Sequence, residues 1–559
     1  MENLRNNRWA SLAVLTIGFL IILIDTTIVN VSIPTIIKDL GASLTDIEWV
    51  ISGYALSFAA LLIAFGRLGD LFGHKKLFIG GLVVFTLFSL LAGHASSPNT
   101  LIFARILQGI GAAMISPATL SIISTTFRGR ERATAFGIWG ATAGVAVAIG
   151  PVLGGYLTTY QTWRWIFYVN IPIGLIGIIL GLLLVQETAP LKKQGIDFAG
   201  MATSALGFTA LVFGLIEGQT YGWFKPTDQV FKLGSYAWSR TDVSIVAVSL
   251  WLSALLLLLF IYIELVKTQR NTGPAVNISF FSHATFRYGL IATAVISLGQ
   301  FSALFTLPTF LQTVKGFTSL QSGYATLPLA VAAFIMAPLS ARLVGRIGPK
   351  WVIFTGVALS AIGLFLLSFI IKVDATYSQI VFPYLLLGAG IGLAIAQTTQ
   401  VTLAEIAPQD SGSASGVLNT VRQIGTALGI AIVGAVLAHQ TAVNIVPAVN
   451  GVQNVPDTVK QQVIAQASKS SISYSAPEQQ AAPVPAFIQS NPSLLEQYQA
   501  KLAQAKADIQ HAVFTALSLS IGQSIRVGAY FVLLGVLFSL LIPNLRHNDG
   551  PEVAAEPGI

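Results

Sequence analysis

Fourteen apolar stretches constrain this chain more than any other feature of its sequence. A helix of about 20 apolar residues crosses the hydrocarbon core of a bilayer, and helices and closed barrels are the only structures that cross it with every backbone polar group satisfied. We therefore predict an all-α polytopic membrane protein with fourteen transmembrane helices. The predicted spans are 9–33, 47–66, 77–95, 100–123, 133–158, 164–186, 197–216, 242–266, 286–312, 321–344, 351–372, 378–403, 412–439 and 522–542.

The composition agrees with a membrane protein. Of the 559 residues, 54% are hydrophobic and only 10% are charged, and the mean hydropathy is +0.74. A water-soluble chain of this length needs more ionised surface. The first apolar stretch, from Trp9 to Val31, is too long for the core of a signal peptide, and no small-residue cleavage site follows it. We expect it to remain as the first span.

Positive charges indicate the orientation in the membrane. The formal net charge is +8, but the Lys and Arg residues are scattered singly between apolar runs, which argues against nucleic-acid binding. They fall at the N-terminus and after the even-numbered spans, and short loops rich in Lys and Arg are normally cytoplasmic. We therefore predict a multi-pass protein of the plasma (inner) membrane with both termini in the cytoplasm. The residues concerned are Arg5, Arg8, Arg67, Lys75, Lys76, Arg128, Arg130, Arg132, Lys192, Lys193, Lys267, Arg270, Arg342, Arg346 and Arg546.

An internal repeat relates the two ends of the chain. The segment Gly66–Lys76 follows the second span and Ala341–Lys350 follows the tenth, and Arg67 matches Arg342 at an offset of 275 residues. Farther along, glycines match at an offset of 279 residues. Two parallel six-span halves with a binding site near the midplane are the plan of many secondary transporters. The matched glycines are Gly109 with Gly388, Gly111 with Gly390, Gly137 with Gly416 and Gly150 with Gly429.

The repeat divides the chain into five predicted parts. The long outer segment is rich in Gln, Ala, Ser and Pro, and its second part, Pro492–Ser518, has apolar residues at helical spacing. This spacing predicts an amphipathic helix near the outer surface, either as a tolerated insertion or as a lid or docking element. The parts are residues 1–190 (N-terminal six-helix bundle), 191–270 (two inserted transmembrane helices), 271–439 (spans nine to thirteen of the C-terminal bundle), 440–521 (extracellular loop) and 522–559 (last span and cytoplasmic tail).

Asp25 is the strongest candidate for proton coupling. It lies inside the first span, where a carboxylate costs about 2.5–3.5 kcal/mol and therefore needs a wet cavity, a partner or a proton. Burial disfavours the charged form of a carboxyl group, so such a group can take up and release a proton as access changes. The alternative is a carboxylate near the outer helix end with local hydrogen bonds. Arg105 shares a helix face with Gln108. It either lowers the pKa of a nearby carboxylate or holds the fourth span against a neighbouring helix.

Two glycine-rich segments indicate moving parts. The segment Gly66–Lys76 predicts a latch in which glycines allow a turn and Asp70 caps a helix or pairs across the boundary between the halves. A segment that only fixed the orientation in the membrane would explain the basic residues but not the spacing of the glycines around Asp70. In the fifth span, glycines and one proline allow a kink and close helix contact, although such packing is common in membrane helices. The latch candidates are Gly66, Asp70, Gly73, Lys75, Arg342 and Arg346, and the fifth-span candidates are Gly150, Pro151, Gly154 and Gly155.

The second half carries its own buried polar group in span thirteen, formed by Asn419, Arg422 and Gln423. We predict that Arg422 either joins Asp25 and Arg105 in proton coupling or ties helices together. Three acids at span ends, Glu48, Glu217 and Glu405, are expected on solvated faces, with a proton relay as the alternative. From position alone, the substrate cavity is expected to be lined by Asn30, Tyr54, Phe58, Gln108, Trp139, Phe301, Phe305, Gln397 and Asn419.

Several kinds of chemistry lack their motifs in this sequence. It contains no cysteine, which excludes disulfides, thiolate metal sites and a cysteine nucleophile. It also contains no phosphate-binding loop, no His-Glu-x-x-His pattern and no paired carboxylates at catalytic spacing. We therefore expect a protein that is not an enzyme and that holds no metal and no cofactor. A proton gradient is the expected source of energy.

These motifs resemble those of the major facilitator superfamily, and within it the fourteen-span drug:proton antiporters of the QacA and EmrB type. The resemblance covers nearly the whole chain except residues 440–521. Gly66–Lys76 is similar to the superfamily's loop after span two, in which Asp70 would take part in the latch. Arg105, Gln108 and Gly109 resemble the span-four motif, whose Arg is implied in proton transfer.

The remaining matches are to exporters in particular. Gly150–Gly155 is similar to the antiporter motif, and two further groups resemble signatures of the fourteen-span branch. The chain departs from the usual patterns at Leu71, His74 and Ala146, where the family pattern has Arg, Arg and Gly. Because histidine titrates near neutral pH, His74 would tune the latch to pH. The signature groups are Asp25, Thr27, Asn30 and Pro34, and the segment Trp163–Gly174.

The resemblance implies a major facilitator fold, with two six-helix bundles and two inserted spans, and a proton-coupled secondary active exporter of hydrophobic or cationic drugs. One alternative is a dedicated exporter of one endogenous metabolite or lipid. Another is a non-transporting scaffold or receptor that uses the outer segment for interactions. The expected partners are a small-molecule substrate, protons and the lipid bilayer, and the chain is expected to act as a monomer without nucleic acid.

Overall fold

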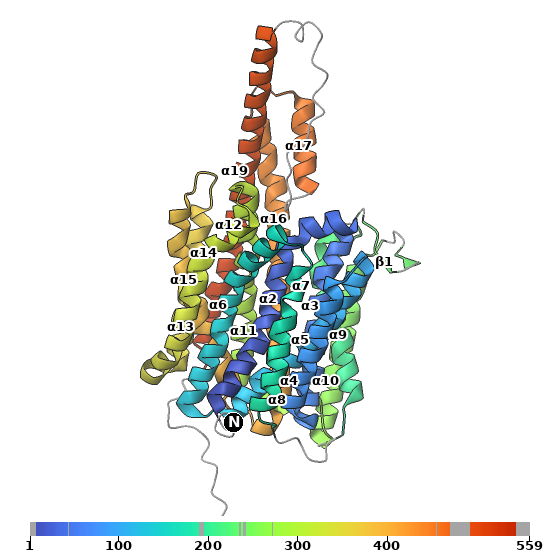
Figure 1. Ribbon diagram of the computed structural model, residues 1–559, viewed down its shortest axis with the longest axis vertical. Coiled ribbons are helices and arrows are strands. Elements are labelled where there is room, and N and C mark those ends of the chain that lie inside the picture. The colour runs from blue at the N-terminus through green and yellow to red at the C-terminus, as the bar shows by residue number, and fades with distance from the viewer. Residues whose placement is uncertain are drawn as a thin grey trace, which may run out of the picture.

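A bundle of long helices with a narrower projection at one end makes up the protein (Figure 1). Helix α2 (Arg8–Leu40) begins at the end marked N, which we call the N-terminal face, and the projection rises from the opposite face. The computed structural model describes residues 7–42, 44–188, 195–227, 229–233, 236–238, 242–270, 272–453, 455–469 and 492–543.

The first half consists of α2 and the helices that follow it up to residue 184. Ser97 accepts a hydrogen bond from the backbone of Thr100 and so starts α5, while Gly41, in the left-handed conformation, ends α2. The sixth predicted span is divided by a short break into α7 and α8. The remaining helices of this half are α3 (Leu44–Phe72), α4 (His74–Gly93), α5 (Pro98–Thr126), α6 (Gly129–Tyr160), α7 (Trp165–Tyr168) and α8 (Asn170–Leu184).

The inserted pair is formed by α9 (Phe198–Tyr221) and α10 (Ile245–Arg270), which pack side by side. A small antiparallel hairpin, β1 (Lys232–Leu233) and β2 (Tyr236–Ala237), lies in the loop between them at the opposite face (Figure 1). Helix α9 also contacts α3 of the first half and a helix of the second half, α16, so the insert covers one seam between the two halves.

The second half repeats the plan of the first. Its first helix, α11 (Ala284–Thr309), is preceded by the 3-10 helix η1 (Ile278–Ser282) and continued by the π-helix η2 (Phe310–Val314). The other elements are α12 (Ser319–Ala325), α13 (Leu327–Ile347), α14 (Pro349–Ile370), α15 (Tyr377–Thr402), η3 (Pro408–Asp410), α16 (Ser411–Asn450), α17 (Asp457–Lys469) and α19 (Pro492–Ser539).

Among the described residues, thirteen helices are long and apolar enough to cross a membrane. They coincide with thirteen of the predicted spans. The ninth predicted span, 286–312, is also helical as α11, but it is not one of the thirteen, so the exact count of fourteen is not confirmed. The prediction of a nearly all-helical membrane protein is confirmed.

Equivalent glycines make equivalent contacts in the two halves, which confirms the internal repeat. A Cβ added to Gly111 would meet Gly81 and Phe85, and one added to Gly390 would meet Gly356 and Ser360. These neighbours are again 275 residues apart, as the offset in the sequence requires. Close approach of helix backbones therefore occurs at the same places in both bundles.

The two halves also meet through symmetric contacts. Gly137 of α6 lies against Ala337 and Pro338 of α13, and the matching Gly416 of α16 lies against Leu62 and Ile63 of α3. Exchanging the two halves therefore converts one of these contacts into the other. The seams are therefore α6 with α13 on one side and α3 with α16 on the other, as expected for two bundles related by twofold pseudosymmetry.

The projection corrects two of the predicted boundaries. Helix α16 has 40 residues and α19 has 48, and both run without interruption through the boundaries predicted at 439/440 and 521/522. The predicted amphipathic helix is therefore not a separate element at the outer surface but the first part of the last span. Helix α17 packs beside α16, and both lie with α19 in the projection (Figure 1). The boundary predicted near residue 190 lies outside the described residues.

Apolar packing explains why these helices continue beyond the membrane. Ile445 and Val449 of α16, Val463 of α17, and Ile509 and Val513 of α19 are all buried and belong to the same hydrophobic cluster as the second half. Because three helices share these side chains, the projection has a core of its own. Its intervening residues 470–491 lie outside the described part of the chain.

Candidate functional site

Asp25 lies in a closed polar network inside the first half. Its side chain is fully buried in α2, and the guanidinium of Arg105 donates through Nη1 to Asp25 Oδ2 at 2.5 Å. The other carboxylate oxygen, Oδ1, accepts from Gln108 Nε2 and from Asn170 Nδ2, each at 2.9 Å. These residues come from α2, α5 and α8. The network therefore ties three helices of one bundle to a single carboxyl group.

A second layer fixes the partners of Asp25. Ser89 of α4 accepts from Gln108 Nε2 at 3.3 Å and from Asn170 Nδ2 at 3.0 Å, and its own hydroxyl donates to the carbonyl of Phe167. Arg105 also donates through Nε to the carbonyl of Val50 at 3.2 Å, and its Cζ lies 4.2 Å from the ring centre of Tyr54. Arg105 and Gln108 are three residues apart on one helix face, and Nη1 donates to Gln108 Oε1 at 2.7 Å.

The network presents donors, and no acceptor, to the Asp25 oxygens. This arrangement fits a carboxylate, because a protonated carboxyl group would need an acceptor for its own hydrogen. A buried ion pair is stable only with good geometry and additional hydrogen bonds, and removing one partner leaves an uncompensated charge. The carboxyl group of Asp25 and the guanidinium of Arg105 are therefore interdependent, as the sequence suggested. Sequence reasoning missed Ser89 and Asn170 as members of this network, because neutral polar residues in apolar helices give no distinctive signal.

The latch between the halves is built on Asp70. Its carboxylate accepts from the backbone N–H of Gly412 at 2.8 Å and of Ser413 at 2.7 Å, which are at the N-terminus of α16. The free N–H groups and positive dipole end of a helix favour such an anion. His74 Nε2 lies 3.0 Å from Asp70 Oδ1, and both side chains are buried. The first half thus binds the second half at the N-terminal face through a carboxylate and a helix terminus.

Other residues close the same face. Gly66 packs directly against the carbonyl of Gly412, leaving no room for a side chain. The hydroxyls of Ser121 and Ser411 are hydrogen bonded across the boundary between the halves. Arg132 donates through Nη2 to the carbonyl of Leu403 at 2.8 Å. The two halves are therefore in contact at the N-terminal face in this conformation.

The remaining predicted latch residues do not bridge the halves. Gly73 has a φ of 103°, which a glycine adopts without strain, and marks the turn between α3 and α4. Lys75 donates through Nζ to the carbonyl of Leu182 at 2.9 Å, within the first half. Arg342 and Arg346 are exposed, and within the described ranges neither makes a hydrogen bond or an ion pair.

The glycines of the fifth span bring α6 close to two neighbours. Gly150 lies against Thr27 and Gly154 against Ile28, both in α2, whereas Gly155 lies against Leu320 of the second half. Helix α6 is continuous through Pro151, so the proline is accommodated within the helix. The motif therefore places α6 between its own bundle and the opposing one.

Arg422 lies in a second polar group, apart from Asp25. It donates to Asn419 Oδ1 at 3.0 Å and to Thr399 Oγ1 at 2.8 Å, within the second half. Its Cζ lies 5.6 Å from the ring centre of Trp139, which belongs to the first half and stacks on Phe19 with a centroid separation of 4.3 Å. The structure thus brings Arg422, Asn419 and Trp139 together across the boundary between the halves, and it does not bring Arg422 to Asp25.

The other cavity candidates are distributed among these groups. Tyr54 and Phe58 are buried in α3, Gln108 belongs to the Asp25 network, and Gln397 donates to Ser340 Oγ at 2.8 Å. Of the acids at span ends, Glu217 is buried, and Glu405 accepts from Thr285 Oγ1 at 2.7 Å. Side chains outside the described part of the chain are those of Asn30, Glu48, Phe301 and Phe305.

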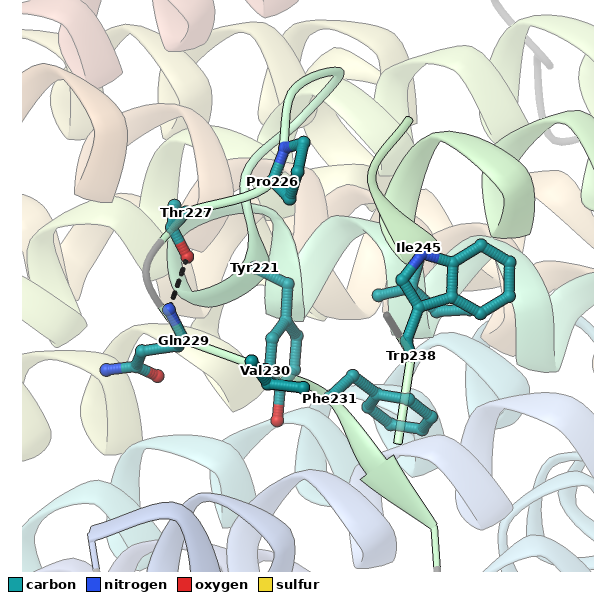
Figure 2. A pocket seen from close by; sticks show the side chains of 8 residues that line it. All are labelled: Tyr221, Pro226, Thr227, Gln229, Val230, Phe231, Trp238 and Ile245. Atoms are coloured by element: carbon teal, nitrogen blue, oxygen red, sulfur yellow. Dashed lines mark hydrogen bonds between the residues drawn. The ribbon is translucent and has the colours of Figure 1, made fainter. Parts of the chain in front are cut away.

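A separate hollow lies in the loop between α9 and α10 (Figure 2). The rings of Tyr221, Phe231 and Trp238 surround it, and the backbone N–H of Gln229 donates to Thr227 Oγ1 at 3.3 Å. It contains none of the predicted site residues, so it is distinct from the groups around Asp25 and Arg422. Its lining consists of Tyr221, Pro226, Thr227, Gln229, Val230, Phe231, Trp238 and Ile245.

Solved structures share this fold at low sequence identity. The human organic anion transporter MFSD10 (TETRAN) matches with a TM-score of 0.55 and 14% identity, over 76% of this chain and 93% of its own. A bacterial homologue of the human lysosomal transporter Spinster, in an inward-facing and unoccupied conformation, matches with a TM-score of 0.52 and 16% identity, over 96% of this chain and 97% of its own.

Curated proteins match at higher identity, and a family model matches as well. The multidrug resistance protein Stp of Mycobacterium tuberculosis is 31% identical over 80% of this chain and 79% of its own length. The puromycin resistance protein pur8 of Streptomyces alboniger is 32% identical over 78% and 83%. The methylenomycin A resistance protein of Bacillus subtilis is 32% identical over 76% and 87%. Because the model of the Major Facilitator Superfamily matches residues 15–430, this chain belongs to that superfamily.

Proposed function

We propose that this protein exports drug-like small molecules across a bacterial-type plasma membrane in exchange for protons, with its N-terminal face in the cytoplasm. The relatives described above are named as resistance proteins for multiple drugs, puromycin and methylenomycin A, which supports export of such compounds. The Lys and Arg residues at the N-terminal face support the orientation.

The observation that carries the proposal is the buried Asp25 network. Asp25 is the acidic residue in the middle of the first span, and its partners are the donors of Arg105, Gln108 and Asn170. A proton arriving at Asp25 removes the charge that holds Arg105. Because a guanidinium remains charged at all relevant pH values, Arg105 must then find other acceptors. Helices α2 and α5 then lose this ion pair, and the first half changes its packing.

The latch at the N-terminal face supplies the second element of an alternating-access cycle. With Asp70 bound to the N-terminus of α16, the cytoplasmic side is closed. Breaking this contact would let the halves separate there and admit substrate. Proton uptake from the outer side and release to the cytoplasm then shift the equilibrium between the two conformations. The shift arises because protonated Asp25 stabilises one conformation and deprotonated Asp25 stabilises the other.

Export from proteoliposomes tests the proposal. We expect the parent protein to move chloramphenicol, an uncharged aromatic drug, against its gradient when a pH gradient is imposed, and Asp25→Asn to lose this response while the protein remains folded. Asp508→Asn is the matched control, because Asp508 is exposed in the projection and, among the described residues, accepts a hydrogen bond only from Gln504. Equal gradient-driven export by the parent and Asp25→Asn would rule out the assigned coupling role.

The orientation can be tested independently. Because the natural chain has no cysteine, a single cysteine placed at Asp457 is a unique label site. We expect a membrane-impermeant maleimide to label Asp457→Cys in intact cells. Labelling only after the cells are broken would invert the proposed topology.

A further inference from the structure

Within the described part of the second half, no acidic side chain pairs with the charge of Arg422. Helices α11, α12, α13, α14, α15 and α16 contain no Asp or Glu at all. The acid nearest in sequence is Asp410, which precedes Arg422 by 12 residues, or about 18 Å along a helix. In the first half, both oxygens of Asp25 are occupied by Arg105, Gln108 and Asn170.

The neighbours of Arg422 are neutral. Its two hydrogen bonds go to the amide oxygen of Asn419 and the hydroxyl of Thr399, and the ring of Trp139 lies within 5.6 Å. Arg422 is partly buried, and a guanidinium that loses much of its hydration without an anion beside it is costly, because hydrogen bonds to neutral groups compensate only in part. Arginine cannot lower this cost by losing its proton. For the same reason, Arg422 cannot itself carry a transported proton.

Two further donors at this place lack acceptors among the described residues. The indole Nε1–H of Trp139 and the amide Nδ2 of Asn419 are buried and make no hydrogen bond. The orientation of the Asn419 amide follows from its oxygen, which accepts from Arg422. Trp139, Asn419 and Arg422 therefore supply a positive charge and two unused donors, but no acceptor. An oxyanion would satisfy all three, because its oxygens accept several hydrogen bonds.

We infer that Arg422, Asn419 and Trp139 form a binding site for the anionic group of an apolar substrate, such as the carboxylate of an aromatic acid. The site joins α16 of the second half to α6 of the first, so a ligand bound there contacts both moving bodies. The stacked rings of Trp139 and Phe19 provide an apolar wall beside the charge. The inference gives a substrate class to the proposed exporter and rests on that function, and it differs from the expectation of cationic drugs.

Binding of two matched probes tests the inference. Pyrenebutyrate and pyrenebutyl-trimethylammonium share an aromatic body and differ in charge, and pyrene accepts fluorescence energy from tryptophan. The full-length protein is titrated in zwitterionic detergent. We expect the parent to bind the carboxylate more tightly, and Arg422→Gln to weaken carboxylate binding by roughly tenfold or more, the loss of one hydrogen bond to a charged group. Binding of the trimethylammonium probe should be retained or become tighter, because a repelling charge is removed, and this binding also shows that the variant is folded.

Two controls sharpen the result. Arg526→Gln removes another arginine that lies over an aromatic ring, 4.4 Å from the centre of Phe369, but at the contact of α19 with α14 and away from the seam. It should leave carboxylate binding unchanged. Arg422→Lys keeps the charge but loses the planar donor pair, and should retain part of the affinity.

Failure of the inference can be separated from failure of the proposed function. Equal carboxylate binding by the parent and Arg422→Gln, or a parent that prefers the trimethylammonium probe, overturns the anion site even if a pH gradient drives export. Conversely, a specific loss of carboxylate binding in Arg422→Gln supports the site even if no pH-driven export is found. Added phosphatidylglycerol that competes with pyrenebutyrate would assign the same oxyanion site to a lipid phosphate.

Discussion

Replacing Asp70 with asparagine should open the latch between the halves. The carboxylate of Asp70 accepts from two backbone N–H groups at the start of α16, and Nδ2 of an asparagine would present a donor where one acceptor now lies. The lost hydrogen bond to a charged group is worth about 1.5–3 kcal/mol, and the lost charge at a helix N-terminus adds about 0.3–1 kcal/mol. The latched conformation should therefore lose about 2–4 kcal/mol relative to the open one.

This energy is large enough to change which conformation predominates. A loss of about 2–4 kcal/mol corresponds to a shift of roughly 30- to 900-fold in the ratio of latched to open protein. If the parent is latched in a ratio of about 99:1, a loss of about 2.7 kcal/mol gives nearly equal populations. Because the estimate concerns one contact, the change should appear without loss of the folded bundle.

A disulfide across the latch provides the assay. Ser121 and Ser411 are hydrogen bonded across the boundary between the halves, and the chain has no natural cysteine to interfere. We expect the double variant Ser121→Cys/Ser411→Cys to cross-link rapidly under mild oxidation, and the addition of Asp70→Asn to slow this reaction at least tenfold. Asp508→Asn in the same background is the control. Equal cross-linking rates with Asp70 and with asparagine would refute the role assigned to Asp70.

Three other predictions follow from the packing and the surface. Gly137→Val and Gly416→Val should reduce the initial rate of export to similar extents, because the two glycines make equivalent contacts at the two seams; a loss confined to one of them would contradict the pseudosymmetry. Val513→Asp should destabilise the projection by about 2 kcal/mol or more, because it buries a charge in an apolar core. This variant should be cleaved faster by a protease between residues 440 and 521. Lys501→Ala, at an exposed position, should be cleaved at the parent rate. Hydrogen bonds from Trp163 and Arg164 lower the pKa of Asp39. The contact among these side chains should therefore persist at neutral pH and be lost only as the pH falls through the lowered pKa. A change in Trp163 fluorescence would report the loss, and an unchanged signal at acid pH would contradict the prediction.

The helices and their repetition could be predicted from the sequence because lipid imposes strong rules. Apolar stretches of fixed length and basic loops mark the spans, and the matched glycines mark places where backbones touch, such as Gly111 and Gly390. Asp25 could be singled out for a similar reason, since an ionisable residue inside an apolar helix is rare and expensive.

The features that escaped prediction have physical reasons as well. Hydropathy falls where a helix leaves the lipid, but its backbone hydrogen bonds continue, so the extensions of α16 and α19 resembled a loop. Ser89 and Asn170 are neutral and common in membrane helices, and only the fold shows that they face Asp25. The separation of Arg422 from Asp25 depends on which face each helix turns inward, which residue spacing within one helix does not determine.

The length of α19 has a mechanical consequence. A helix of 48 residues is about 72 Å long, while the hydrocarbon core it crosses is about 30 Å thick, so about 40 Å extends away from the bilayer. The part within the bundle packs on α11, α14 and α16, which binds it to the second half. A tilt of that half by 10° about the point where α19 leaves the bilayer would move the far end, about 40 Å away, through roughly 7 Å. A small tilt of the second half within the bilayer thereby becomes a larger displacement of the projection in the aqueous space outside.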